Sequence, residues 1–281
     1  MTEPSTRLRV WLGRTITYGS LGLACLVALL PLVVLMMASL KTSNEFATQG
    51  VLDPPGDWFN FSNFAAFFVE GNVVQGFLNT SFILVISVIG TVIIGSMTAF
   101  ALDRFEFRLK RTVVLLFLFA ALVPTVTAQV TTFQLVANMH LYNTRFAPIL
   151  LFIGTDIVSI YIFMQFMRGI PRSLDEVALL DGASQFTIYR KIVLPLMKPA
   201  IATVVIIKGV AIYNEFYIPY LYMPSRDLGV VATTLSRFAG PQSTRWEVIA
   251  AGVVITMIPT LVAFLVLQRY IYNGFTRGAA K

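Results

Sequence analysis

Six long runs of apolar residues alternate with short polar segments along this chain. A helix needs about 20 apolar residues to cross a hydrocarbon core of about 30 Å, and each run is about that long or longer. The whole chain is 57% hydrophobic and 12% charged, whereas an average soluble domain is about one quarter charged. We therefore predict an all-α membrane protein. Its six transmembrane helices are expected at residues 16–40, 77–102, 113–136, 147–167, 200–222 and 249–270.

The first apolar run follows three arginines, as the core of a signal peptide would. It is much longer than the about 7–15 residues of such a core, and no cleavage site with small residues follows it. We therefore expect it to remain as a membrane span. The predicted organisation is a cytoplasmic amino terminus at 1–15, a six-span region at 16–272 and a cytoplasmic tail at 273–281.

Lysine and arginine are distributed unevenly between the segments that connect the spans. With the amino terminus inside, the inner segments hold about three times as many of these residues as the outer ones, in agreement with the positive-inside rule. Both termini are then expected in the cytoplasm. The net charge of +7 is explained by this topology and by attraction to anionic lipid headgroups, so it implies no nucleic-acid partner.

The sequence lacks the common motifs for chemistry. It has no G-x-x-x-x-G-K-[ST] phosphate loop, so we expect another subunit to bind ATP. The single histidine, His140, has no cysteine or carboxylate at ligand spacing, and no nucleophile motif such as G-x-S-x-G occurs. Cys25 is the only cysteine, so no internal disulfide can form. We predict a transport subunit that has no metal, cofactor or enzymatic activity of its own.

A charged segment at residues 173–195 lies between the fourth and fifth predicted spans. Ser173 and Glu176 have the spacing of a capping box, which predicts the start of a helix. Gly182 can adopt a left-handed conformation at low cost, so it can end that helix and turn the chain into a second one. Pro195 is expected to end the second helix. The simpler alternative is an amphipathic helix at the membrane interface.

The spacing within this segment is specific. Glu-Val-Ala is followed by three residues, Gly182, nine residues and Ile-Val-Leu-Pro. This pattern resembles the coupling loop, or EAA motif, of ABC importer permeases, although Val177 stands where the family has its first alanine. In that family the loop docks onto the ATPase as a helix-turn-helix. The resemblance therefore implies an ATPase-coupling site, with Glu176 making a charge-assisted contact, formed by Glu176, Ala178, Leu179, Asp181, Gly182, Ala183, Phe186, Tyr189, Leu194 and Pro195.

Three ionisable residues stand out inside predicted spans, where each costs several kcal/mol unless it faces protein or water. Asp156 is in the fourth span, and Lys208 and Glu215 are in the fifth. We expect Asp156 and Lys208 to form an intramembrane ion pair, either as a structural element or next to the cargo. Lys208 and Glu215 are seven residues apart, so a continuous helix would place them on one face.

A polar and aromatic cluster surrounds Glu215. Amide and carboxylate groups can bind hydroxyls, while aromatic rings cover the C–H faces of a sugar. Farther along, Tyr220 and Tyr222 fit the interfacial aromatic belt better. The predicted translocation path is Tyr213, Asn214, Glu215 and Phe216.

Three further motifs extend the resemblance over nearly the whole chain. Residues 213–216 resemble a family Trp-Asn-Glu-Phe motif, residues 168–171 resemble its lead-in to the coupling loop, and residues 268–281 resemble its carboxy-terminal ending. The chain thus resembles the second, six-span permease of sugar-importing ABC transporters of the maltose/trehalose type.

That resemblance implies a type I ABC importer permease fold with a cytoplasmic coupling helix between spans four and five, in the inner membrane of a bacterium. It also implies a heterodimer with a second permease, two ATP-binding subunits that hold ATP and Mg, and an extracytoplasmic sugar-binding protein. The cargo would be a disaccharide or oligosaccharide, moved by alternating access. In the family, the tail lies against the ATPase, and the outer segment at 223–247 contacts the binding protein.

Other functions remain open at this point. An ABC permease could carry a non-sugar or a sugar-phosphate solute. A secondary transporter would also explain the spans and the intramembrane charges, but those folds often contain internal repeats, and none is evident here. A membrane enzyme is weakened by the missing nucleophile and metal motifs.

Overall fold

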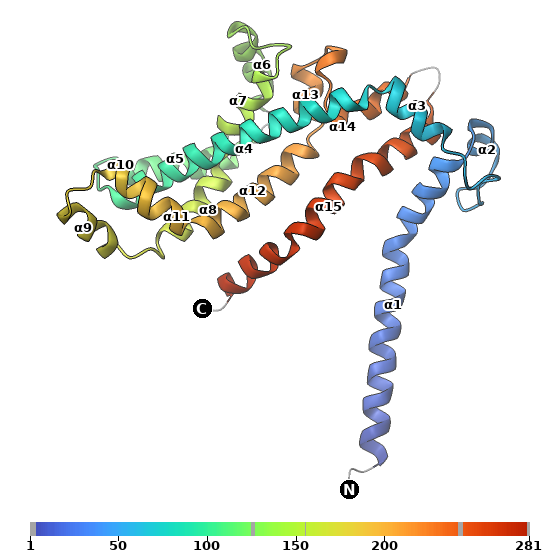
Figure 1. Cartoon of the computed structure of the whole chain (residues 1–281), viewed down its shortest axis with the longest axis horizontal. Helices are drawn as coiled ribbons and strands as arrows, with labels where there is room; N and C mark the ends of the chain where they lie inside the picture. The colour runs from blue at the N-terminus through green and yellow to red at the C-terminus, as the bar shows by residue number, and fades with distance from the viewer. Residues whose placement is uncertain (1–3, 125–126, 155, 241–243, 280–281) are drawn as a thin grey trace. The chain divides into compact units, whose positions relative to one another are not determined.

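The structure is a computed structural model that describes residues 4–124, 127–154, 156–240 and 244–279. Every element within these ranges is helical, apart from one isolated β-bridge between Ala239 and Thr244 (Figure 1). The elements are α1 (Pro4–Leu40), α2 (Ser43–Thr48), α3 (Ser62–Glu70), α4 (Val73–Arg104), α5 (Lys110–Leu122), α6 (Gln129–Asn138), α7 (Phe146–Gly154), α8 (Ile157–Met167), α9 (Ser173–Leu180), α10 (Gln185–Ile188), η1 (Tyr189–Val193), α11 (Leu194–Leu196), α12 (Lys198–Tyr213), α13 (Tyr217–Tyr222), η2 (Arg226–Leu228), α14 (Val231–Thr234), η3 (Leu235–Phe238) and α15 (Trp246–Ala279).

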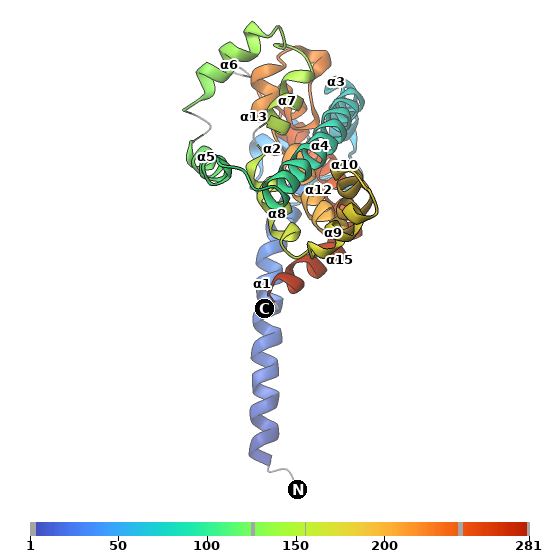
Figure 2. The same ribbon diagram turned by 90° about the vertical axis from the view of Figure 1, so that its left-hand side faces the viewer.

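The chain forms two compact units, one of residues 1–72 with 235–257 and the other of residues 73–234 with 258–281. In the first unit, α1 is one continuous helix (Figure 2), and its apolar stretch is almost entirely exposed. Its carboxy-terminal end is held by Asn63, whose side-chain amide donates to the carbonyls of Ser39 and Lys41. The rest of α1 therefore offers its apolar surface to lipid or to another protein.

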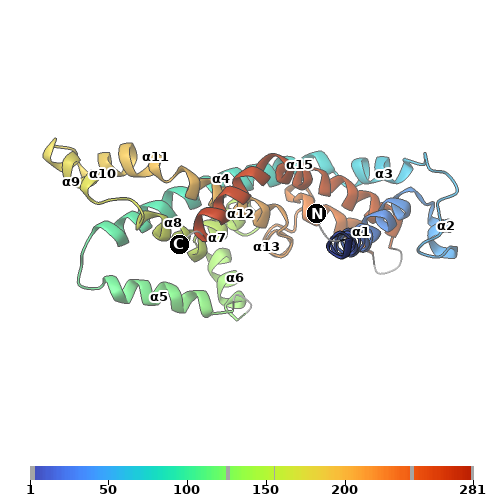
Figure 3. The same cartoon turned by 90° about the horizontal axis from the view of Figure 1, so that it is seen from below.

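In the second unit, α4 packs against α7, α8 and α12. Glycines on α4 allow the close approach that membrane helices use. A Cβ at Gly90 would overlap the Ile153 side chain, and one at Gly95 would lie 3.2 Å from the Phe163 ring. At the carboxy-terminal end of α4 lie α9, α10 and α11 (Figure 3).

Three helices in the described ranges are long and apolar enough to cross a membrane, namely α1, α4 and α15. Two bent pairs would raise the number to five: α7 with α8, which meet at 43°, and Gln185–Leu196 with Lys198–Tyr213, which meet at 73°. The first, second and sixth predicted spans thus correspond to continuous helices. The predicted number of six spans is not reached by this criterion.

The third predicted span, at 113–136, is not one helix. α5 ends at Leu122, and α6 begins at Gln129 in a different direction (Figure 2). Val123 has extended dihedral angles of φ −72° and ψ 120°, as expected for a residue that precedes a proline, here Pro124. Residues 1–3, 125–126, 155, 241–243 and 280–281 lie outside the described ranges. They belong to the predicted amino terminus, the third and fourth predicted spans, the outer segment at 223–247 and the carboxy-terminal tail.

Candidate functional site

The 173–195 segment contains the predicted turn between two helices. Gly182 has φ +81°, the left-handed conformation that the sequence predicted. Its N–H donates to the Leu179 carbonyl at 3.0 Å, and the Ala183 N–H donates to the Ala178 carbonyl at 2.9 Å. These two bonds are those of a Schellman motif. The prediction that Gly182 ends α9 is therefore confirmed.

The predicted start of α9 is wrong. Arg172 is the residue that precedes the helix, no side chain caps it, and Ser173 is already its first residue. The backbone turns earlier than expected, because the Leu174 N–H donates to the Pro171 carbonyl and the Asp175 N–H to the Arg172 carbonyl. Such short-range bonds begin the helix without the capping box that Ser173 and Glu176 would have formed.

The predicted end of the second helix at Pro195 is also wrong. The chain passes from α10 through the π-helical turn η1 into α11, which contains Pro195, and the sharp bend comes at Met197. Pro199 explains that position, because its ring would clash with the Pro195 carbonyl in a continuous helix. Near the start of α12, where Pro199 lies, the missing N–H has no cost.

The predicted coupling residues divide into an exposed and a buried group. Among the apolar side chains, Phe186 is 60% exposed and Leu179 is 46% exposed, and Leu180, which is next to the predicted set, is 88% exposed. Ala178 and Tyr189 are buried, whereas Ala183 and Leu194 are partly buried. The exposed group comprises Glu176, Leu179, Asp181, Gly182, Phe186 and Pro195.

The sequence analysis placed Tyr189 in the coupling site, but its side chain is buried within this chain. It is 6% exposed, its hydroxyl lies 2.8 Å from the Ser96 hydroxyl on α4, and its ring lies 5.5 Å from the ring of Phe100. A tyrosine next to charged Arg190 and Lys191 looks exposed in sequence. The π-helical turn and the nearby core of α4 and α8 instead bury it.

We expect Tyr189→Phe to reduce the stability of the permease by about 0.5–1.5 kcal/mol, the usual net contribution of one hydrogen bond. The Ser96 hydroxyl keeps its bond to the Val92 carbonyl, so the loss stays small. Tyr189→Ala would empty a buried site and cost about 3–5 kcal/mol, as for other large aromatic residues. Thermal unfolding of the detergent-solubilised complex measures both. Unchanged unfolding of Tyr189→Ala would contradict the buried position.

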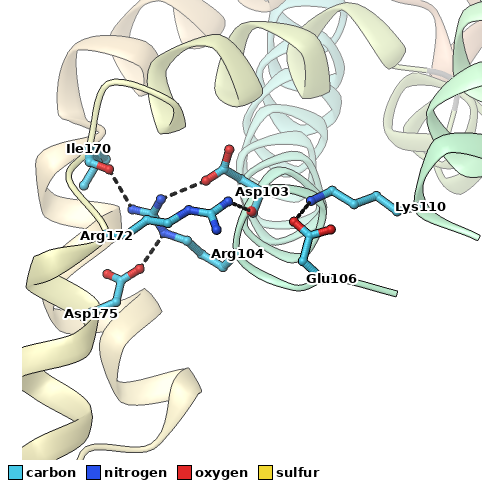
Figure 4. A network of polar contacts seen from close by, with 7 residues as sticks. All are labelled: Asp103, Arg104, Glu106, Lys110, Ile170, Arg172 and Asp175. Carbon is cyan, nitrogen blue, oxygen red and sulfur yellow. Dashed lines mark hydrogen bonds and ion pairs between the residues drawn. The ribbon is translucent and has the colours of Figure 1, made fainter. Parts of the chain in front are cut away.

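A network of charged residues joins α4 to α9 (Figure 4). The Arg104 guanidinium lies 2.5 Å from an Asp175 carboxylate oxygen and 2.8 Å from that of Asp103, and it donates to the Ile170 carbonyl at 3.1 Å. Arg172 donates to the Asp103 carbonyl at 2.6 Å. The sequence analysis missed this network, although a basic residue at one helix end and an acidic one at another helix start were visible signals.

Asp156 and Lys208 form the predicted ion pair. The Lys208 ammonium lies 3.2 Å from an Asp156 carboxylate oxygen, and the side chains are 16% and 9% exposed. Asp156 also caps α8, because its carboxylate accepts hydrogen bonds from the backbone and the hydroxyl of Ser159. The pair therefore lies where the fourth predicted span is broken between α7 and α8.

The fifth predicted span is broken at the polar cluster. α12 ends at Tyr213, so Lys208 and Glu215 do not share the face of one helix, which corrects that prediction. Pro219 favours the break, because its ring would clash with the Glu215 carbonyl in a continuous helix. The Glu215 carboxylate accepts from the Ile218 N–H at 3.1 Å and the Asn214 amide donates to the Val210 carbonyl at 2.9 Å.

The amino-terminal part of α4 holds a loop that the sequence analysis had not connected with it. The buried Asn79 amide donates to the carbonyls of Asp227 at 2.8 Å and Gly229 at 2.9 Å. The Thr80 hydroxyl accepts from the Val231 N–H at 3.0 Å. Asn79 and Thr80 therefore fix residues 227–231 to this end of α4.

The backbone geometry at His140 explains why a histidine occupies this position. It has φ +56° after the end of α6, where its N–H and that of Leu141 donate to the carbonyls of Ala137 and Val136. This is again a Schellman motif, in a position that tolerates histidine better than most residues. Within the part of the chain that the structure describes, no three metal-ligating side chains come together.

Residues 91–277 match the model of a protein family described as binding-protein-dependent transport system inner membrane component. The arabinooligosaccharides transport system permease protein AraQ of Halalkalibacterium halodurans is 30% identical over 259 residues, which cover 91% of this chain and 92% of that protein. The melibiose/raffinose/stachyose import permease protein MelC of Bacillus subtilis is 30% identical over 266 residues, covering 92% of this chain and 95% of that protein.

A crystal structure of a bacterial ABC transporter involved in the import of the acidic polysaccharide alginate contains a similar chain. The TM-score is 0.79 at 21% identity, and the match covers 96% of this chain and 99% of the other. The likeness establishes the fold, which is that of a type I ABC importer permease.

Proposed function

Because this chain belongs to the family of binding-protein-dependent transport system inner membrane components, we propose that it is one permease subunit of an ATP-driven sugar importer. It moves a disaccharide or oligosaccharide across the cytoplasmic membrane by alternating access. The names of two 30% identical relatives support a sugar as cargo, since both are permeases for oligosaccharides or related sugars. The family itself consists of transport subunits and not of catalytic enzymes.

The complete importer contains three kinds of partner. A second permease completes the translocation path, two ATP-binding subunits bind ATP and Mg, and an extracytoplasmic binding protein delivers the sugar. The description of the family supports the dependence on a binding protein. The almost uncovered apolar surface of α1 supports packing against lipid and the second permease.

We place the 173–195 segment and both termini in the cytoplasm, in a protein with six membrane crossings. The excess of basic residues in the inner segments supports this orientation. In such a topology, α7 with α8 forms one crossing, α12 with α13 forms another, and α5 with α6 supplies the remaining one.

The observation that carries the proposal is the exposure of apolar side chains on the 173–195 segment. Leu179, Leu180 and Phe186 are exposed around a turn that is fixed by the Gly182 Schellman motif. A cytoplasmic segment with large uncovered apolar residues is a binding surface for another protein. We assign that partner as the ATPase, with Glu176 adding a charge-assisted hydrogen bond.

The translocation path is proposed to pass the break between α12 and α13. Transporters place substrate sites at interrupted membrane helices, because irregular backbone is tolerated there only next to a cavity or protein. Asn214 and Phe216 are exposed in this chain, and Tyr213 and Glu215 are partly buried. The rings of Phe216 and Tyr220 stack at 5.1 Å, which presents an aromatic surface for a sugar.

The proposal is tested by uptake into proteoliposomes that contain the complete importer and its binding protein. Labelled arabino-oligosaccharides, melibiose, raffinose and maltodextrins are offered with ATP inside the vesicles, with a non-hydrolysable ATP analogue and without nucleotide. We expect uptake of at least one sugar only with ATP. Uptake without ATP would favour a secondary transporter, and ATP-dependent uptake restricted to a sugar phosphate or a non-sugar solute would reject sugar as the cargo.

A further inference from the structure

Opposite charges at two helix ends join α4 to α9. Arg104 is the last residue of α4, and Asp175 lies in the first turn of α9. A cation at a carboxy-terminal end and an anion at an amino-terminal end each complement the dipole of their own helix. Their ion pair at 2.5 Å therefore connects the ends of two helices that are far apart in sequence.

Arg104 holds three groups at once. Its side chain is only 6% exposed, and it contacts Asp103, Asp175 and the Ile170 carbonyl. A planar guanidinium presents several fixed donors and can therefore contact all three groups at once, whereas a lysine ammonium offers no comparable fork. Because Ile170 belongs to the connector between α8 and α9, the arginine fixes that connector together with both helix ends.

Stability alone does not explain the arrangement. The second carboxylate oxygen of Asp175 and the Nε of Arg104 are both buried and have no hydrogen-bond partner among the described residues, so the contact between the two side chains is an ion pair without a well-aligned hydrogen bond. A buried ion pair with an unsatisfied oxygen is often less stabilising than apolar side chains of similar size. The physical advantage that remains is a defined position of α9 relative to α4.

α4 extends from this network to the outer loop. It has 32 residues, which correspond to about 48 Å of helix. Asn79 and Thr80 near its other end bind residues 227–231. One continuous helix therefore connects the Arg104 network with the 227–231 segment, which is held to its other end by hydrogen bonds.

We propose that Arg104 is a positioning residue that fixes α9 to α4, so that a movement of the 173–195 segment on the ATPase is transmitted to α4. Without it, the connector at 168–172 would bend and absorb that movement. This inference rests on the proposed function, since it needs an ATPase that moves the segment. Specifically, α9 and α4 are expected to move together because the Arg104 guanidinium holds both helix ends.

The first test measures sugar molecules transported per ATP hydrolysed by the complete importer in proteoliposomes. Arg104→Lys keeps the charge but loses the fork, and we expect the ratio to fall about two- to thirtyfold, the range of coupling changes seen for residues outside ligand sites. Arg104→Met leaves the carboxylates of Asp103 and Asp175 without their cation, and Asp175→Leu leaves Arg104 with Asp103 alone, so both should reduce assembly, the first more strongly. The double variant leaves only the Asp103 carboxylate unpaired and should recover part of the assembly but not the ratio.

The matched control is Lys110→Met, which breaks the exposed ion pair with Glu106 close to the same end of α4. We expect this variant to assemble and to keep the wild-type ratio, because exposed pairs contribute little. Wild-type ratios in both Arg104→Lys and the assembled double variant would overturn the proposal. A merely structural role would lower the amount of complex and leave the ratio unchanged.

A second measurement does not depend on the cargo. Spin labels at Met97 on α4 and Ser173 on α9, in a Cys25→Ser background, report the distance between the two helices with and without trapped ATP. We expect one narrow distance distribution in both states, and a broad one in Arg104→Lys. Equal widths in both proteins would overturn the inference, whereas failure of sugar uptake with a narrow wild-type distribution would count only against the proposed cargo.

Discussion

Gly182→Val is expected to leave the permease assembled while sugar uptake by the importer falls about 5- to 150-fold, the range that corresponds to 1–3 kcal/mol. The residue has φ +81°, and a Cβ there would meet no atom within 4 Å. The cost is therefore backbone strain of about 1–3 kcal/mol for a β-branched residue, without a steric clash. That strain opposes the bond from the Ala183 N–H to the Ala178 carbonyl, so α9 and α10 would no longer be held in one geometry.

The matched control is Gly182→Asn, because asparagine adopts left-handed dihedral angles more readily than other side chains. We expect it to keep most of the uptake, with Gly182→Ala between the two variants. Uptake and ATP hydrolysis are measured with equal amounts of purified complex. If Gly182→Val and Glu176→Ala both transport at wild-type rates, the assignment of this segment as the coupling site is wrong.

Asp156→Asn and Lys208→Met are each expected to lower the amount of assembled permease strongly. The two side chains are largely buried and lie 3.2 Å apart. Removing one partner of a buried pair costs about 3–5 kcal/mol, because the other charge is left without compensation. The double variant has no such charge, and the amide oxygen of the introduced asparagine can still accept from Ser159, so part of the assembly should return.

Assembly is measured as the amount of complex recovered from membranes by size-exclusion chromatography. Glu106→Gln serves as the control, since its ion pair with Lys110 is exposed and its loss should not change the yield. A double variant that assembles no better than the single ones would argue against a compensating pair. If the double variant assembles but no longer imports sugar, the pair also lies on the path of the cargo.

Local chemistry allowed several features to be predicted from the sequence. The apolar runs of α1, α4 and α15 are unbroken, and hydropathy along a window reports such helices directly. Gly182 was predictable because few residues adopt left-handed dihedral angles at low cost. The pairing of Asp156 with Lys208 followed from the cost of a lone charge in a membrane.

Hydropathy did not predict the breaks in the third, fourth and fifth spans. A hydropathy window sums the apolar character of the side chains and contains no information on the conformation of the backbone. Pro124 and Pro219 each favour a helix end, yet such residues remain within apolar runs because neighbouring groups can satisfy the freed backbone. At the break before α13, that role belongs to Glu215, which accepts from the Ile218 N–H.

The sequence by itself thus determined the membrane-embedded helical class, the turn at Gly182 and the need for an intramembrane ion pair, since each depends on one residue type or one local run. Only the tertiary structure decided that Tyr189 faces inward to Ser96 and that Arg104 joins Asp175. Both contacts connect residues that are far apart along the chain. No local pattern encodes them, because they arise only when α4 packs against the helices around it and brings both ends of each contact together.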